Sequence, residues 1–184
     1  MPASPMRGYI PTILAKAASI LPLLPLELAA RRLFANALKA RPAFALRLGE
    51  HAGRTFAIDP VDCPFVFLIA PEGGRAKLRV VRDLSASAYD ARIAAPLVVL
   101  LGMIDGTYDG DALFFSRDLV IEGDTAAVLA LRNAIENAEF DPSLVLGLPQ
   151  NVSGPFNRAT DMALGRLRRS LDAPEPSGRK AYSP

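Results

Sequence analysis

Apolar residues recur along this chain with two different periods. From Leu26 to Leu38 they return every three or four residues, with Arg31, Arg32 and Lys39 outside the stripe, which predicts an amphipathic helix. Three later segments read as strands, by alternation or by aromatic and β-branched content: 54–58, 65–69 and 76–82. Turn-forming Pro and Gly residues separate them. This order predicts three consecutive strands in an antiparallel meander.

The second half of the chain continues with two more strands and two helices. Ala91–Ala95 is the fourth predicted strand, and Pro96 opens an uncharged apolar helix over Leu97–Ile104. The fifth predicted strand runs from Leu113 to Glu122. Asp124 is a good N-cap for a helix that ends near Glu139.

The two ends of the chain differ from this middle. A short helix is predicted from Thr12 to Leu21, stopped before Pro22, and Pro25 suits the first turn of the next helix. After a predicted loop at 147–154, the last helix has an apolar stripe at Phe156, Ala159, Ala163, Leu167 and Leu171. We divide the chain into an N-terminal apolar segment (1–25), one domain (26–140), a C-terminal loop with a basic amphipathic helix (141–171) and a disordered tail (172–184).

Charge is unevenly distributed along the chain. Residues 1–50 hold seven basic and two acidic side chains, residues 51–150 eight and fourteen, and residues 151–184 six and three. Basic ends around an acidic middle indicate that the ends meet an anionic surface; the alternative is chance unevenness. The acidic middle lacks a basic-aromatic platform, so no nucleic-acid binding is predicted.

The sequence points to a reducing compartment. Cys63 is the only cysteine, so an intramolecular disulfide cannot form. The N-terminus is a poor signal peptide, and no window approaches the ~18–20 apolar residues of a membrane span. We predict a soluble cytoplasmic protein, with contact to a membrane as a further expectation.

Nothing in the sequence predicts catalysis, a metal or a cofactor. His51 is the only histidine and falls in a turn, and Cys63 reads as an incidental thiol. Asp105, Asp109 and Asp111 read as turn formers, because the EF-hand pattern is absent. No catalytic residue is therefore assigned.

The uncharged helix predicted over Leu97–Ile104 indicates an apolar interior. Because it has no polar face, it must be buried on all sides or line an apolar cavity. The candidate lining residues come from the helix and the strands expected around it: Phe65, Phe67, Ile69, Leu97, Val98, Leu100, Leu101, Ile104, Phe114, Phe115 and Leu119. The alternative is that they simply fill a core. In a strand only one of Phe114 and Phe115 can face the cavity, and we favour Phe115.

A family resemblance becomes visible between residues 90 and 139. Its signs are the strand that starts at Asp90, the apolar helix, the acidic turn with Asp109-Gly110-Asp111, and Phe114-Phe115 before Leu119-Val-Ile-Glu-Gly-Asp124. The pattern resembles the sterol carrier protein type-two family of lipid-binding domains, over roughly residues 26–140. The resemblance implies an α+β fold: a five-stranded mixed sheet, helices packed on one face, and an apolar cavity between them. Many members have a glycine at about Arg117 or Asp118, which this chain lacks.

The run FFSRDLVIEGDT and the basic C-terminal helix look similar to one bacterial branch, accessory factors of ubiquinone biosynthesis on its oxygen-independent route. This resemblance implies a non-catalytic protein without a cofactor. Its ligands would be isoprenoid quinone precursors or phospholipid, and its partners ubiquinone biosynthesis enzymes, including peptidase-like iron–sulfur hydroxylation proteins. A general phospholipid or fatty-acyl carrier with no quinone role is the alternative, and an enzyme or enzyme subunit the third reading.

The terminal segments are candidates for membrane contact. The last helix carries four arginines that we predict at an anionic membrane surface: Arg158, Arg166, Arg168 and Arg169. Each basic residue there would contribute about 1 kcal/mol. The alternative is an ordinary packed helix with a solvated basic face. Segment 9–24 has three open interpretations: membrane contact, a dimer face or a lid.

Overall fold

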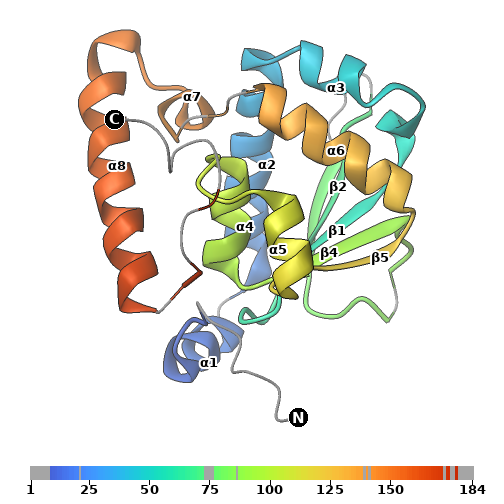
Figure 1. Cartoon of the computed structure of the whole chain (residues 1–184), viewed down its shortest axis with the longest axis horizontal. Coiled ribbons are helices and arrows are strands. Elements are labelled where there is room, and N and C mark those ends of the chain that lie inside the picture. The colour runs from blue at the N-terminus through green and yellow to red at the C-terminus, as the bar shows by residue number, and fades with distance from the viewer. Residues whose placement is uncertain are drawn as a thin grey trace.

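A computed structural model of the chain describes residues 9–20, 22–72, 77–85, 87–138, 140, 142–171, 173–174 and 177. The strands are β1 (Phe56–Pro60), β2 (Val66–Ala70), β3 (Lys77–Val81), β4 (Ala91–Ala95) and β5 (Val120–Gly123). The helices are α1 (Thr12–Ile20), α2 (Leu23–Ala40), α3 (Ala43–Arg47), the 3-10 turn η1 (Gly49–Gly53), α4 (Leu97–Ile104), α5 (Gly110–Ser116), α6 (Thr125–Ala138), α7 (Pro142–Leu146) and α8 (Gln150–Ser170). Figure 1 shows the sheet on one side of the molecule and α8 on the other.

The five strands form one mixed sheet in the order β3-β2-β1-β4-β5. β1 and β4 run parallel, with Phe56 opposite Ala91, and the other neighbours are antiparallel. The predicted meander of three strands, followed by a crossover to two more, is confirmed. The predicted bounds of β4 and α4 are also confirmed. The predicted cap at Asp124 is confirmed as well, because its side chain accepts a hydrogen bond from the Ala127 amide (3.0 Å).

Helix α2 covers the exposed edge of the sheet at β3. Its Glu27 carboxylate accepts from the Val80 amide (2.8 Å), and its Arg31 Nε donates to the Leu78 carbonyl (2.7 Å). These side chains satisfy backbone groups that an edge strand otherwise presents to other chains. The N-terminal helix pattern therefore also protects the sheet.

The main core lies on the face of the sheet that the helices cover. Phe56 and Ile93 from the strands pack there with Val99 of α4, Leu131 of α6 and Phe44 of α3. A smaller cluster of Ala57, Val66 and Leu68 occupies the other face, against Val81 and Leu84. Because buried apolar area is the largest favourable term in folding, this layer of helices on sheet fixes the architecture.

The predicted strand over Leu113–Glu122 is wrong in its first half. Residues Gly110–Ser116 form helix α5, and β5 contains only Val120–Gly123. Asp109 caps the helix by accepting from the Asp111 amide (2.8 Å), and Arg117 ends it in a left-handed conformation with φ of 65°. A short apolar run fits a strand or a helix equally well by periodicity. The N-cap at Asp109 favours the helix. A left-handed position of this kind favours glycine, and here Arg117 occupies it.

The predicted loop at 147–154 is also wrong. Helix α8 already begins at Gln150, after the separate short helix α7. Pro149 is the N-cap residue of α8, and Pro155 lies inside the helix. Pro149 forfeits no internal hydrogen bond, because the amides of the first turn have no internal acceptor. Pro155 lies in the second turn and cannot donate to the carbonyl four residues before it.

Candidate functional site

Helix α4 stands at the centre of the candidate site, between α8 and α5 in Figure 1. Val98, Val99 and Leu100 are at most 7% exposed. The remaining side chains are equally apolar: Leu97, Leu101 and Met103 are half-buried and Ile104 is 42% exposed. Leu97, Leu101 and Ile104 lie on one side. Their spacing of four and three residues places these three on one line along the helix. We call Leu97, Leu101 and Ile104 the apolar line of α4.

A buried carboxylate caps the first turn of α4. Asp62, between β1 and β2, accepts from the Leu97 amide (2.8 Å) and also from the Ile10 amide (2.9 Å). Pro96 has no side chain for this role, so the cap comes from a distant segment. The same carboxylate thereby fixes the N-terminal segment next to α4.

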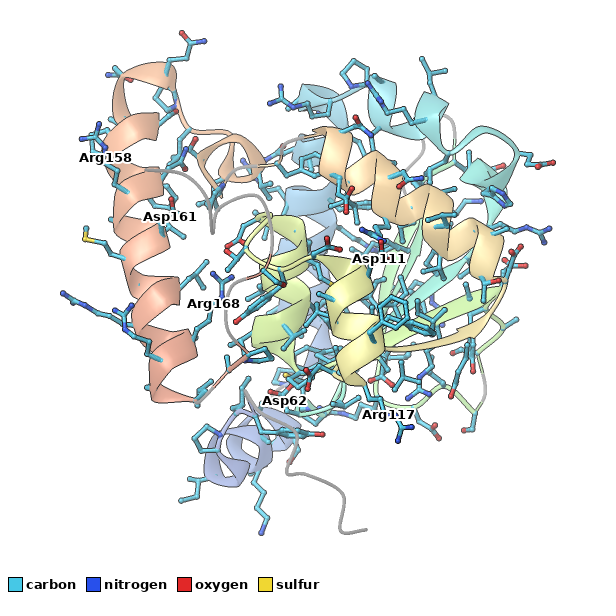
Figure 2. All side chains as sticks on the ribbon, in the orientation of Figure 1. Asp62, Asp111, Arg117, Arg158, Asp161 and Arg168 are labelled. Atoms are coloured by element: carbon cyan, nitrogen blue, oxygen red, sulfur yellow. The ribbon has the colours of Figure 1, made fainter. Side chains whose placement is uncertain are left out.

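The opposite end of α4 is fixed to the C-terminal helix. Asp105 accepts from Arg168 Nη2 of α8 (2.9 Å), and the two side chains are only 8% and 11% exposed. Thr107 joins them by donating to Asp105 (2.6 Å) and accepting from Arg168 Nη1 (2.9 Å). Figure 2 shows Arg168 pointing from α8 towards the body of the molecule. We call Asp62 and Asp105 the anchor aspartates.

Tyr108 completes the stack between α4 and α8. Its ring lies against Gly102, where an added Cβ would come within 2.1 Å of the ring, and the Arg168 guanidinium lies 5.5 Å from the ring centroid. Burial raises the pKa of the Tyr108 hydroxyl, Arg168 opposes that rise, and Asp105 and Asp118 add to it. The hydroxyl is buried and has no hydrogen-bond partner among the described residues.

The predicted lining residues separate into three groups. Val98, Leu100 and Leu119 are buried in the body of the protein. Phe65, Phe67 and Ile69 are half-buried together with Leu97 and Leu101, and the rings of Phe65 and Phe67 are 5.4 Å apart in an edge-to-face contact. The remaining three, Ile104, Phe114 and Phe115, are exposed.

The two phenylalanines of α5 do not occupy the place predicted for them. Phe114 is 53% and Phe115 84% exposed, and both lie on a helix rather than on a strand. Strand alternation therefore does not apply, and the preference for Phe115 as the inward residue was wrong. Leu113 is the buried residue of that run, at 2% exposure.

The four C-terminal arginines fall into two groups, exposed and paired. Arg158, Arg166 and Arg169 are exposed on α8, whereas Arg168 is engaged by Asp105 and Thr107. The prediction of Arg168 at a membrane surface is therefore wrong. A local pattern could not reveal this, because its carboxylate partner is 63 residues away in the sequence.

Sequence reasoning also missed Asp62 and Tyr108. Asp62 sits in a turn-like Val-Asp-Cys-Pro run, and its acceptance from Ile10 spans 52 residues. Tyr108 stands next to Asp109 in a segment that reads as a turn. The useful signal was Gly102: a glycine inside an otherwise bulky apolar helix marks a close approach.

The chemistry of the described side chains gives little support for catalysis. Burial, followed by the Asp62 charge, raises the pKa of the Cys63 thiol to about 12, so it is not a thiolate near neutral pH. Asp109 and Asp111 both pair with Arg132 of α6, which ties α5 to α6. Within the described ranges no cluster of His, Cys, Asp or Glu could hold a metal ion. None of the helices in those ranges is long and apolar enough to cross a membrane.

Comparison with known proteins identifies the family of this chain. No protein with a curated description matches the chain. A solved UbiJ-SCP2 ubiquinone synthesis protein is 23% identical, with a TM-score of 0.50, and the match covers 66% of this chain and 98% of that one. Sterol carrier protein 2 from Yarrowia lipolytica, in its apo form, is 11% identical with a TM-score of 0.43, over 59% and 88% of the two chains. The model of the SCP-2 sterol transfer family matches residues 34–136, and the chain belongs to that family.

Proposed function

We propose that this protein is a non-catalytic lipid-binding accessory factor of ubiquinone biosynthesis. It binds isoprenoid quinone intermediates or membrane lipids and presents them to the enzymes of that pathway. Family membership over residues 34–136 supports lipid binding, and the likeness to a ubiquinone synthesis protein supports the pathway. The oxygen-independent route and peptidase-like iron–sulfur hydroxylation partners, in the cytoplasm or at the inner membrane, are part of the same proposal.

The apolar line of α4 is the observation that carries this proposal. A helix at the rim of a core normally turns polar residues outward, but the incompletely buried side chains of α4, among them Leu97, Leu101 and Ile104, are all apolar. The half-buried Phe65 and Phe67 offer further apolar surface from the sheet side. Apolar surface left incompletely covered in this way is typical of a ligand groove.

The energetics favour a long hydrocarbon tail in such a place. Each methylene that leaves water contributes about 0.8 kcal/mol, so a polyprenyl tail binds tightly without a single hydrogen bond. Selectivity among tails of similar length is then low. A polar head group must supply any preference for a quinone over an ordinary acyl chain.

The Tyr108 hydroxyl is a suitable group for that preference. It is buried, lacks a partner among the described residues, and belongs to a ring that packs on Gly102 of α4. Its O–H can donate to a quinone carbonyl or phenol oxygen, which a simple hydrocarbon chain does not offer. Leaving a buried hydroxyl unpaired costs about 1–3 kcal/mol, so a ligand oxygen there adds a comparable gain.

Lipid extraction and a pair of matched variants test this function. Protein purified from its own host is extracted, and binding of added prenylated quinone is measured by native mass spectrometry. Leu101→Glu places a charge on the apolar line and should abolish co-purifying lipid, whereas Leu129→Glu, on a 54% exposed leucine of α6, should not. Circular dichroism confirms that both variants fold. The absence of any lipid from the unaltered protein, together with no binding of added quinone, would count against the proposal.

Ligand identity separates the quinone role from the alternative. Prenylated phenols or quinones in the extract, and weaker quinone binding by Tyr108→Phe, support the ubiquinone role. Phospholipid or fatty acid alone, bound equally well by Tyr108→Phe, indicates a general acyl-chain carrier. Deleting the gene and measuring cellular quinone with and without oxygen gives an independent test; normal quinone under both conditions excludes the pathway role.

A further inference from the structure

Helix α8 has an outer face that the rest of the molecule leaves uncovered. It is 21 residues long, and none of its residues is buried. Residues on its inner side make the contacts to the body: Asn157 accepts from the Ser143 amide (2.9 Å), and Arg168 pairs with Asp105. On the other side Met162 is 60% exposed. The inner side of the helix also holds half-buried Phe156, Leu164 and Leu171, and the opposite side faces solvent.

Three arginines and a methionine share this free surface. Arg158, Met162, Arg166 and Arg169 follow one another at intervals of four, four and three residues, which places them on one line along the helix. All four are exposed. Within the described part of the chain these three arginines pair with no carboxylate. Figure 2 shows Arg158 pointing away from the body and Arg168 pointing towards it. We call these four residues the outer line of α8.

The anchor at Asp105 determines which side of α8 faces outward. Of the apolar stripe seen in the sequence, Phe156 and Leu171 are half-buried, whereas Leu167 is 42% exposed and Ala159 and Ala163 are also exposed. Arg168 instead takes the inner side. Ala159 and Ala163 are left beside the outer line and face solvent together with its arginines.

We propose that the outer line of α8 docks on the surface of an anionic phospholipid bilayer. The three arginines span about 16 Å along the helix axis, a diffuse charge that suits a field of lipid phosphates. Exposed Met162 lies in the same line and enters the boundary between head groups and acyl chains. A helix that lies in the plane of a membrane surface has this combination of basic and apolar side chains. This surface lies outside residues 34–136, so its role does not depend on what the family domain binds.

Vesicle flotation with the full chain tests the proposal. Vesicles of phosphatidylcholine with and without phosphatidylglycerol are mixed with unaltered protein and with a triple variant, Arg158→Gln, Arg166→Gln and Arg169→Gln. A matched triple, Arg32→Gln, Arg47→Gln and Arg79→Gln, removes the same charge from exposed arginines elsewhere. We expect binding only to the anionic vesicles, reduced roughly a hundredfold by the outer-line triple and nearly unchanged by the control. Added salt should weaken the interaction.

Three results overturn the proposal. If the unaltered protein floats with neither kind of vesicle, α8 is not a membrane-docking surface. Equal losses in the two triples mean that net charge alone drives binding. Full binding by the outer-line triple means that the membrane is met elsewhere on the molecule. All substituted positions are exposed, and thermal unfolding of each variant verifies that the fold is retained.

Discussion

The body of the molecule and its two terminal helices are held together by different forces. The body is closed by apolar burial: Phe56 and Leu131 are both fully buried, between sheet and helices. Helix α8 has no buried residue, and on α1 Ile13 and Ile20 are 79% and 85% exposed. The terminal segments instead contact the anchor aspartates at the two ends of α4. Apolar packing thus sets the fold, and polar contacts with Asp62 and Asp105 help to set the position of the ends.

The largest effect is expected from the body. Phe56→Ala removes a fully buried ring from β1 and should lower the free energy of unfolding by about 3–5 kcal/mol, through lost burial and the cavity left behind. Urea denaturation followed by circular dichroism measures this loss. A cost below 1 kcal/mol would mean that the core is not organised around this strand.

Breaking the anchor at Asp105 should release α8 without unfolding the body. Arg168→Met removes one member of a buried ion pair, and the opening free energy of α8 should fall by about 3 kcal/mol. Hydrogen exchange should accelerate in 150–170 while β1 and β4 keep their protection. Arg166→Met, on an exposed arginine of the same helix, is the control and should leave exchange unchanged. Simultaneous loss of protection in both regions would contradict the division into body and attached ends.

The anchor at Asp62 should have a smaller effect that reaches both regions. Asp62→Ala leaves the amides of Leu97 and Ile10 without their acceptor and should cost about 1–2 kcal/mol, the range of a helix cap. Exchange at the start of α4 and at residues 9–20 should rise together. Asp62→Asn keeps one acceptor oxygen and should recover part of the loss; equal losses in the two variants would exclude the hydrogen bonds as the cause.

The smallest effect is expected at the exposed aromatic pair. Phe115→Ser changes an 84% exposed side chain and should shift the free energy of unfolding by no more than about 0.5 kcal/mol. Leu113→Ala on the same helix should cost about 2–5 kcal/mol, because its side chain is buried. Reversed magnitudes in thermal or urea unfolding would restore the strand interpretation of this segment.

The sequence allowed prediction of those parts of the fold that are coded locally. Pro96 and Asp105-Gly106 bracket α4, and Asp124 caps α6, so these elements were predicted with their ends nearly right. Segment 110–116 failed because Leu113-Phe114-Phe115 fits a strand as well as a helix. The contacts that Asp62 and Asp105 make with the two ends join residues more than 50 positions apart, which no local pattern encodes.

The placement of the anchor aspartates also has a mechanical consequence. A force that pulls the two ends of the chain apart acts on Ile10 at one end, and at the other on Ser177, whose amide donates to the Thr107 carbonyl (3.1 Å), and then on α8. It therefore reaches Asp62 and Asp105. The load is then borne by the two ends of one eight-residue helix, before the hydrogen bonds of the sheet are stretched. The ends should yield at low force and in separate steps, and the sheet afterwards as a unit. A partner that draws on either end could thus expose α4 while the sheet remains intact.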